Sequence, residues 1–225
     1  MANLNCFFIV TILWVFSVCL HEFGHAWAAY RGGDYTVRDK GYLTMNPFKY
    51  LHPVYSLLMP VVFLMLGGIG LPGGAVYIER QLLRSRAWDC WVSLAGPTMN
   101  VALILLLGLG FKSGLIPYES GHIASYSMAF LLQLQISALL LNLLPLPPLD
   151  GFQALSPWLP DEVRERMLAA SNYTMLILFV ALWNIAPLNH AFWGAVNWIC
   201  SAMGVSPGLA AQGYFALRFW EQRGF

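Results

Sequence analysis

Long runs of apolar residues constrain the fold of this chain more than any other feature. The first extends from Leu4 to about Tyr30 and contains no lysine or arginine. A helix of about 20 apolar residues crosses a bilayer core about 30 Å thick. Apolar residues make up 58% of the chain and charged residues only 10%, too few to cover a water-exposed surface. We therefore expect an all-α polytopic membrane protein, and the same composition excludes disorder and nucleic-acid binding through a basic face.

Together with the first run, four further apolar runs predict about five transmembrane helices. The runs that we interpret as further spans cover about Cys90–Phe111, Ile123–Leu149, Tyr173–Ala186 and, more weakly, His190–Val205. The tail, Gly208–Phe225, mixes aromatic residues with arginines, which is typical of an amphipathic helix lying in the membrane interface. Residues 1–20 lack the basic start and the cleavage site of a signal peptide, so we expect them to be retained as part of a span.

The distribution of basic residues predicts the orientation of these spans. Residues 31–88 carry seven of the twelve lysines and arginines, whereas residues 112–122 carry one. Residues 151–172 and the tail carry two each. Because lysine and arginine are enriched in cytoplasmic connections, we expect 31–88, 151–172 and the tail to lie on the cytoplasmic side.

This orientation restricts the apolar run Val54–Gly70. If both of its ends are cytoplasmic, it has to enter and leave by one face, as a re-entrant or interfacial segment. Pro60 and the glycines of this run suit such a broken element, which is tolerated where protein buries it. The alternative, a full span, would place Arg80, Arg84 and Arg86 outside, so we favour the re-entrant interpretation.

Three ionisable residues cluster near the end of the first apolar run. His21-Glu22-Phe23-Gly24-His25 is an HExxH motif, in which two imidazoles four residues apart share one helix face and can bind a single Zn²⁺. The glutamate beside them can act as a general base. Side chains that reach the interface or pair with one another are the alternative, but ionisable residues inside spans are rare and usually functional. No basic partner lies nearby, so we favour metal binding.

A catalytic zinc has three protein ligands and an open position for water, so one ligand is still missing. Asp150 suits this role because, under the orientation above, it falls at the same cytoplasmic depth as His21. Pro145, Pro147 and Pro148 break the helix just before it, which could aim its carboxylate at a metal, although prolines also simply end helices.

Two asparagines lie near the predicted site. Asn142 precedes Asp150 by two helical turns and could hydrogen-bond a substrate carbonyl or an oxyanion. Asn100 belongs to the polar element Gly96–Asn100, near the cytoplasmic start of its span. We predict both as substrate-binding residues, with interhelical hydrogen bonding as the alternative, which is favoured for Asn100.

Together these motifs resemble those of the site-2 protease family of intramembrane zinc metalloproteases, in its short form without a PDZ domain. The matching segments are His21–His25, Gly41–Lys49, Ala95–Asn100 and Asn142–Gly151. The resemblance implies one zinc ion per chain held by His21, His25 and Asp150, with Glu22 as the base and Asn142 contacting substrate. It also implies a single domain over 1–225, with a catalytic core over about 4–151 and C-terminal helices over about 152–225.

The resemblance further implies that the substrate is a transmembrane helix of another protein, cleaved in the bilayer of a prokaryotic plasma (inner) membrane. The chain departs from the family pattern at Tyr50–Pro53 and at Leu71–Ile78, which leaves substrate choice open. Within the latter, Ala75–Ile78 could form a short β-strand that pairs with an unwound substrate.

The expected function is hydrolysis of peptide bonds in or near transmembrane segments, by a zinc-activated water with Glu22 as general base. The alternative is a non-proteolytic membrane protein, either a zinc-binding scaffold or a metal transporter. A transporter typically has internal repeats and ionisable residues along a path, and neither is found here. A scaffold derived from a protease would be expected to have lost a ligand or the glutamate, and all four residues are present.

Overall fold

The computed structural model describes residues 2–46, 76–119 and 121–218, and these residues form helices and connections without a β-strand. Three helical segments are long and apolar enough to cross a membrane: Leu4–Gly32, Arg86–Lys112 and Ile123–Asn142. A fourth candidate exists only if Asp161–Ala169 and Tyr173–Asn184, bent by 69°, are taken as one broken span. The all-helical membrane architecture is therefore confirmed, whereas the expected number of about five spans is not.

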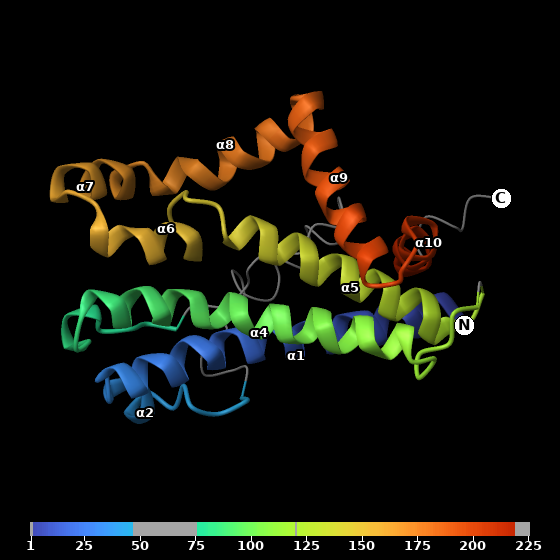
Figure 1. Cartoon of the computed structure of the whole chain (residues 1–225), viewed down its shortest axis with the longest axis horizontal. Coiled ribbons are helices and arrows are strands. Elements are labelled where there is room, and N and C mark those ends of the chain that lie inside the picture. Colours follow the sequence, from blue (N-terminus) through green and yellow to red (C-terminus); the bar gives the residue numbers. More distant parts are fainter. Residues whose placement is uncertain (1, 47–75, 120, 219–225) are drawn as a thin grey trace.

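Helices α1 (Ala2–Gly32), α4 (Arg86–Lys112) and α5 (Ile123–Asn142) form the centre of the molecule. They run side by side along the long axis in Figure 1. Helix α5 is the most enclosed of the three. In its apolar 18-residue stretch 67% is buried, against 33% in that of α1 and 39% in that of α4. Its interior side chains, including Phe130 and Leu134, form one hydrophobic cluster with residues of α1 such as Trp14.

Helices α1 and α4 approach closely because glycine replaces larger side chains where they meet. A Cβ atom at Gly24 would lie only 2.8 Å from the carbonyl oxygen of Ala95. Small residues allow such backbone contact between helices in membranes, where packing rather than water drives association. Gly24 lies between the two histidines of the HExxH motif, so this contact holds the motif against α4.

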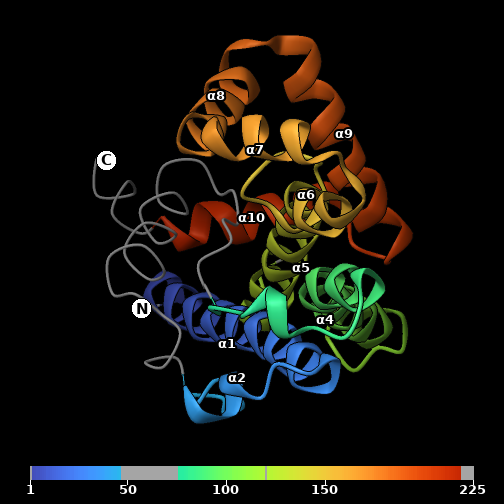
Figure 2. The same cartoon turned by 90° about the vertical axis from the view of Figure 1, so that its left-hand side faces the viewer.

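Short elements lie at the end of the bundle where α1 finishes, which is the left end in Figure 1 and faces the viewer in Figure 2. They are α2 (Thr36–Asp39), η3 (Arg80–Leu82), α6 (Asp150–Leu155), η4 (Ser156–Trp158) and α7 (Asp161–Ala169). Residues 76–79, which form neither helix nor strand, precede η3. The fully buried Asp34 accepts a hydrogen bond from the amide of Glu79 at 2.8 Å, and Lys40 pairs with the Glu79 carboxylate at 3.1 Å. These contacts fix the segment 76–79 beside the end of α1.

The C-terminal helices differ from the prediction of two spans. Helix α8 (Ser171–Asn184) has 14 residues and α9 (Ala186–Ala202) has 17, so each is shorter than a typical span. Together they lead from the α7 end of the bundle to the opposite end (Figure 1).

The chain after α9 therefore lies at the other end of the bundle. The amide of Ser206 donates to the hydroxyl of Tyr118 at 3.1 Å, which places it beside the connection 112–122. The described part of the tail, expected on the same side as residues 31–88, therefore lies toward the other end of the bundle, and the side of the membrane stays a prediction. Residues 31–88 and 151–172 retain nine of the basic residues counted in the sequence.

Helix α10 (Pro207–Leu217) packs one face against α5 and α1. Its buried residues include Leu209, Ala210 and Leu217, whereas Phe215 is exposed. The Sγ atom of Cys6 contacts the carbonyl oxygen of Gly213 at 3.8 Å. Over its described part, the predicted interfacial tail is thus a helix attached to the bundle.

Several predicted features lie outside the described residues. They are the re-entrant run Val54–Gly70, the segment Tyr50–Pro53, Ala75 of the predicted strand, and residues 219–225 of the tail. Residues 76–78 of that strand are described and do not form a strand.

The crossing of α10 over α5 yields a test of this packing. A Cβ atom at Gly213 would collide with the carbonyl oxygen of Tyr126, whereas one at Gly208, on the same helix, would meet nothing within 4 Å. We expect Gly213→Ala to destabilise the protein by about 1–3 kcal/mol through overpacking. Thermal unfolding in detergent should then show a midpoint lower by several degrees, while Gly208→Ala leaves it unchanged or slightly higher. Equal midpoints for the two variants would contradict the crossing.

Candidate metal centre

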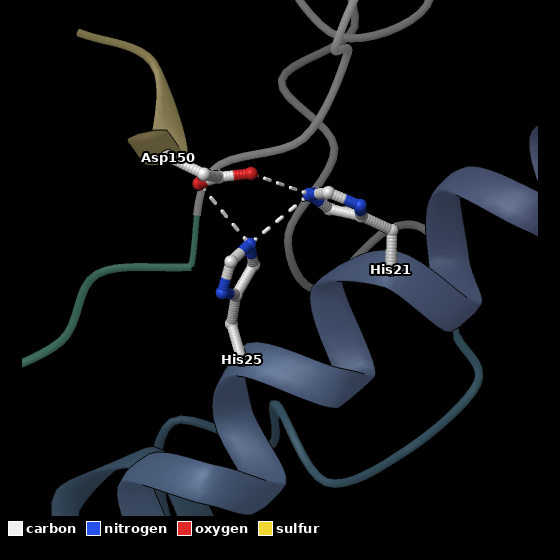
Figure 3. A group of neighbouring side chains, drawn as sticks. All are labelled: His21, His25 and Asp150. Carbon is white, nitrogen blue, oxygen red and sulfur yellow. Dashed lines mark hydrogen bonds and ion pairs between the residues drawn. The ribbon is translucent and has the colours of Figure 1, made fainter. Parts of the chain in front are cut away.

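The two histidines of the HExxH motif lie on one face of α1, as their spacing predicts. His21 and His25 are both buried, and their Nε2 atoms are 3.0 Å apart. Both Nε2 atoms point toward the same space in Figure 3. Because α1 continues to Gly32, the motif lies inside a long helix rather than at its end.

Asp150 reaches this space from a different part of the chain. Helix α5 ends at Asn142, earlier than the predicted end near Leu149, and residues 143–149 turn the chain into α6, which begins at Asp150. A Cβ atom at Gly151 would collide with the carbonyl oxygen of Leu143, so glycine is required for α6 to fold back this tightly. This turn brings the carboxylate of Asp150 to the two imidazoles (Figure 3).

The distances among the three side chains match a zinc site. One carboxylate oxygen of Asp150 is 3.2 Å from His21 Nε2, and the other is 3.4 Å from His25 Nε2. Zinc–nitrogen and zinc–oxygen bonds of about 2.0–2.1 Å in tetrahedral geometry separate neighbouring ligand atoms by about 3.3 Å. His21, His25 and Asp150 form the metal-ligand cluster that the described residues contain. Two imidazoles and one carboxylate are a ligand set of catalytic zinc, so these residues fit the ion.

The outer nitrogens of both imidazoles are hydrogen-bonded. The Nδ1 atom of His25 is 2.7 Å from the carbonyl oxygen of Val92, and the Nδ1 atom of His21 is 2.6 Å from Oδ1 of Asn100. A carbonyl oxygen only accepts hydrogen bonds, so Nδ1 of each neutral ring carries the proton. The lone pair of each Nε2 then faces the shared space, as a metal ligand requires.

Gly96 on α4 leaves the space in front of the imidazoles open. A Cβ atom there would lie 2.6 Å from His21 Nε2 and would also collide with His25 Nε2. Any larger residue at this position would therefore displace the two nitrogens. The sequence motif contains Gly96, but only the structure shows that its missing side chain is what the site needs.

The three side chains open onto a cavity of about 580 Å³. Its lining also includes Glu22, Asn142, Val76, Ile78 and Arg80. Glu22 is buried, and its Oε2 accepts a hydrogen bond from the amide of Val76 at 3.1 Å. The carboxylate of Glu22 thus lines the same cavity as the metal-ligand cluster and is bound by the segment 76–79.

The two predicted substrate-binding asparagines occupy different places. Asn142 is buried and lines the cavity together with Asp150. Asn100 lies behind His21, where its amide nitrogen donates to Oε1 of Gln135 at 3.2 Å. Gln135 in turn donates to Ser17 at 2.6 Å.

Neither Gln135 nor Ser17 was among the predicted site residues. Both were visible as polar side chains in apolar runs, and Ser17 precedes His21 by four residues on the same helix face. Their connection to the site required the contacts between helices.

Comparison with known proteins also indicates zinc chemistry. The chain is 44% identical to Rip2 of Mycobacterium tuberculosis and to Rip2 of Mycolicibacterium smegmatis, over 98% of its own length and 84% of theirs. It is 29% identical to YwhC of Bacillus subtilis over 87% of its length and 88% of that protein's. All three are named as zinc metalloproteases. This chain belongs to the site-2 protease family.

Membership in the site-2 protease family agrees with the resemblance found in the motifs. The names of these relatives imply a zinc cofactor, and the cluster of His21, His25 and Asp150 is a site that fits one. Together they support a metalloprotease function. Neither a family model nor a solved structure matches the chain.

The role of Gly96 can be tested by metal analysis. We expect Gly96→Ala to reduce bound zinc at least 10-fold in the purified protein, because the added methyl group occupies the space between the imidazole nitrogens. Gly194→Ala on α9 is the control, since a Cβ atom there meets nothing within 4 Å. Elemental analysis of both variants gives the comparison, and full zinc occupancy in Gly96→Ala would contradict the geometry of the site.

Proposed function

We propose that this chain is an intramembrane zinc metalloendopeptidase that hydrolyses peptide bonds in or near transmembrane segments of other membrane proteins. The observation that carries the proposal is the convergence of four groups on one cavity: the imidazoles of His21 and His25 and the carboxylates of Asp150 and Glu22. A metal-binding scaffold or transporter needs the first three but has no use for a carboxylate held beside them. Family membership supports the same conclusion.

One zinc ion, bound by His21, His25 and Asp150, would supply a water of lowered pKa and an electrophile for the substrate carbonyl. Glu22 takes the proton of that water and later delivers it to the leaving amine. Its hydrogen bond from the Val76 amide orients the carboxylate within the cavity. Asn142 lines the same cavity and offers an amide N–H to the oxyanion that develops on the scissile carbonyl.

The segment 76–79 supports a proposal for substrate binding. Val76 and Ile78 line the cavity, and the segment is fixed by the hydrogen bonds of Glu79 with Asp34 and Lys40. An amide bond in a transmembrane helix is occupied by helical hydrogen bonds, so the substrate has to unwind before cleavage. We propose that the unwound peptide pairs with the backbone of residues 76–78, by strand addition.

The decisive experiment separates zinc binding from proteolysis. We expect Glu22→Gln to retain zinc but to cleave a membrane-embedded reporter at least about 100-fold more slowly, because the amide cannot accept the proton. The matched control is Glu165→Gln on α7, an exposed glutamate away from the cavity. Cleavage at the wild-type rate by Glu22→Gln would contradict the proposed mechanism, and zinc without any cleavage by the wild-type protein would favour the scaffold.

We also propose that the catalytic cavity faces the cytoplasmic side of a plasma membrane. The support is the concentration of basic residues in 31–88 and 151–172, whose described parts lie at the cavity end of the bundle. Lys112 ends α4 beside Gly204, and Arg218 follows α10 beside Tyr214, both toward the other end.

Site-directed labelling in intact cells tests this orientation. In a background without the native cysteines, we expect a membrane-impermeant maleimide to label Ser113→Cys from outside. Glu165→Cys should react only after the cells are permeabilised. The reverse pattern would show that the cavity opens to the outside.

A further inference from the structure

A line of buried polar side chains runs behind His21 and connects three helices. His21 Nδ1 contacts Asn100 Oδ1 at 2.6 Å, and the amide nitrogen of Asn100 donates to Gln135 at 3.2 Å. Gln135 donates to the hydroxyl of Ser17 at 2.6 Å, and that hydroxyl donates to the backbone carbonyl of Trp14 at 2.7 Å. All four side chains are buried, with exposures of 6% or less. We name His21, Asn100, Gln135, Ser17 and the Trp14 carbonyl the polar relay.

The Trp14 carbonyl at the end of the polar relay determines which group donates in each of its hydrogen bonds. A backbone carbonyl can only accept, so the Ser17 hydroxyl must donate its proton to Trp14 and offer its lone pair to Gln135. Gln135 therefore presents its NH₂ group to Ser17 and its oxygen to Asn100. The amide of Asn100 is then oriented with its NH₂ toward Gln135 and its oxygen toward His21.

The orientation of the Asn100 amide determines which nitrogen of His21 carries the proton and which can bind the metal. An oxygen facing Nδ1 of His21 keeps the proton on Nδ1 and leaves the Nε2 lone pair free for zinc. If the Asn100 amide turned over, its NH₂ would face Nδ1 and favour the tautomer with the proton on Nε2. That tautomer presents a donor instead of a lone pair to the zinc position.

We propose that Gln135 and Ser17 are positioning residues, which lock the orientation of the Asn100 amide and thereby the tautomer of His21. The inference rests on the zinc site of the proposed function but concerns metal affinity rather than hydrolysis. It also assigns Asn100 a place behind the metal ligand instead of on the substrate.

The geometry favours this role over simple joining of helices. A hydrogen bond that only ties α4 to α5 would serve equally well with either amide turned over, whereas the polar relay is anchored at one end by a carbonyl. His25 shows the same arrangement in shorter form, since its Nδ1 contacts the carbonyl of Val92 directly. A backbone carbonyl always presents an acceptor to its histidine, whereas the side-chain amide of an asparagine can rotate and present its NH₂ group instead. Only His21 therefore needs additional residues that fix the orientation of its partner.

The test compares zinc affinities of purified full-length proteins by competition with a chelator. We expect Gln135→Leu to bind zinc about 10–100-fold more weakly, as is typical when a group behind a metal ligand is removed. Gln133→Leu, the same change on the same helix but outside the polar relay, should bind as the wild type does. Thermal unfolding in detergent verifies that both variants are folded.

A second variant distinguishes orientation from structural damage. A carboxylate has two accepting oxygens and no donor, so it holds the His21 proton on Nδ1 whichever way it turns. We therefore expect Asn100→Asp, combined with Gln135→Leu, to restore zinc affinity to within a few-fold of the wild type. A packing defect at Gln135 would not be repaired by a change at Asn100.

Each outcome bears on the proposal. Wild-type affinity in Gln135→Leu, or weak binding that Asn100→Asp does not restore in a folded protein, would overturn it. If the wild type binds no zinc, the polar relay and the proposed function fail together. If Glu22→Gln still cleaves while the rescue is observed, the proposed mechanism fails and the polar relay stands.

Discussion

The structure depends on bringing two imidazoles and one carboxylate within about 3 Å of one another inside an apolar helical bundle. Three lone-pair donors so close together repel or compete for protons unless a cation lies between them, and buried charges are unfavourable unless they are paired. A zinc ion satisfies all three at once. A site that fits one zinc ion therefore lies where side chains of α1 and α6 meet.

The surrounding helices satisfy this constraint mainly with glycines. Gly24 lets α1 touch the backbone of α4, Gly96 leaves room for the imidazole nitrogens, and Gly151 lets α6 fold back on the end of α5. In each case a Cβ atom would collide with backbone or with a metal ligand. The missing side chains therefore shape the site as much as His21, His25 and Asp150 do.

The sequence predicted which three side chains cluster, but not their surroundings. His21 and His25 follow from helical spacing, and Asp150 from its depth and the prolines before it. The structure brings all three together. The predicted spans Tyr173–Ala186 and His190–Val205 correspond to α8 and α9, but they are not confirmed as spans, because hydropathy marks an apolar run without showing whether its helix is long enough to cross a bilayer. The position of Asn100 behind His21 depends on the packing of α4 against α1 and α5, which no local pattern encodes.

X-ray absorption spectroscopy of the zinc-loaded protein tests the central claim, that His21, His25 and Asp150 together hold the metal. The account predicts four nitrogen or oxygen ligands at about 2.0–2.1 Å, with the multiple scattering of two imidazoles and no sulfur. The four cysteines are free thiols, and three of them are buried. Scattering from sulfur at about 2.3 Å, or from fewer than two imidazoles, would contradict the account.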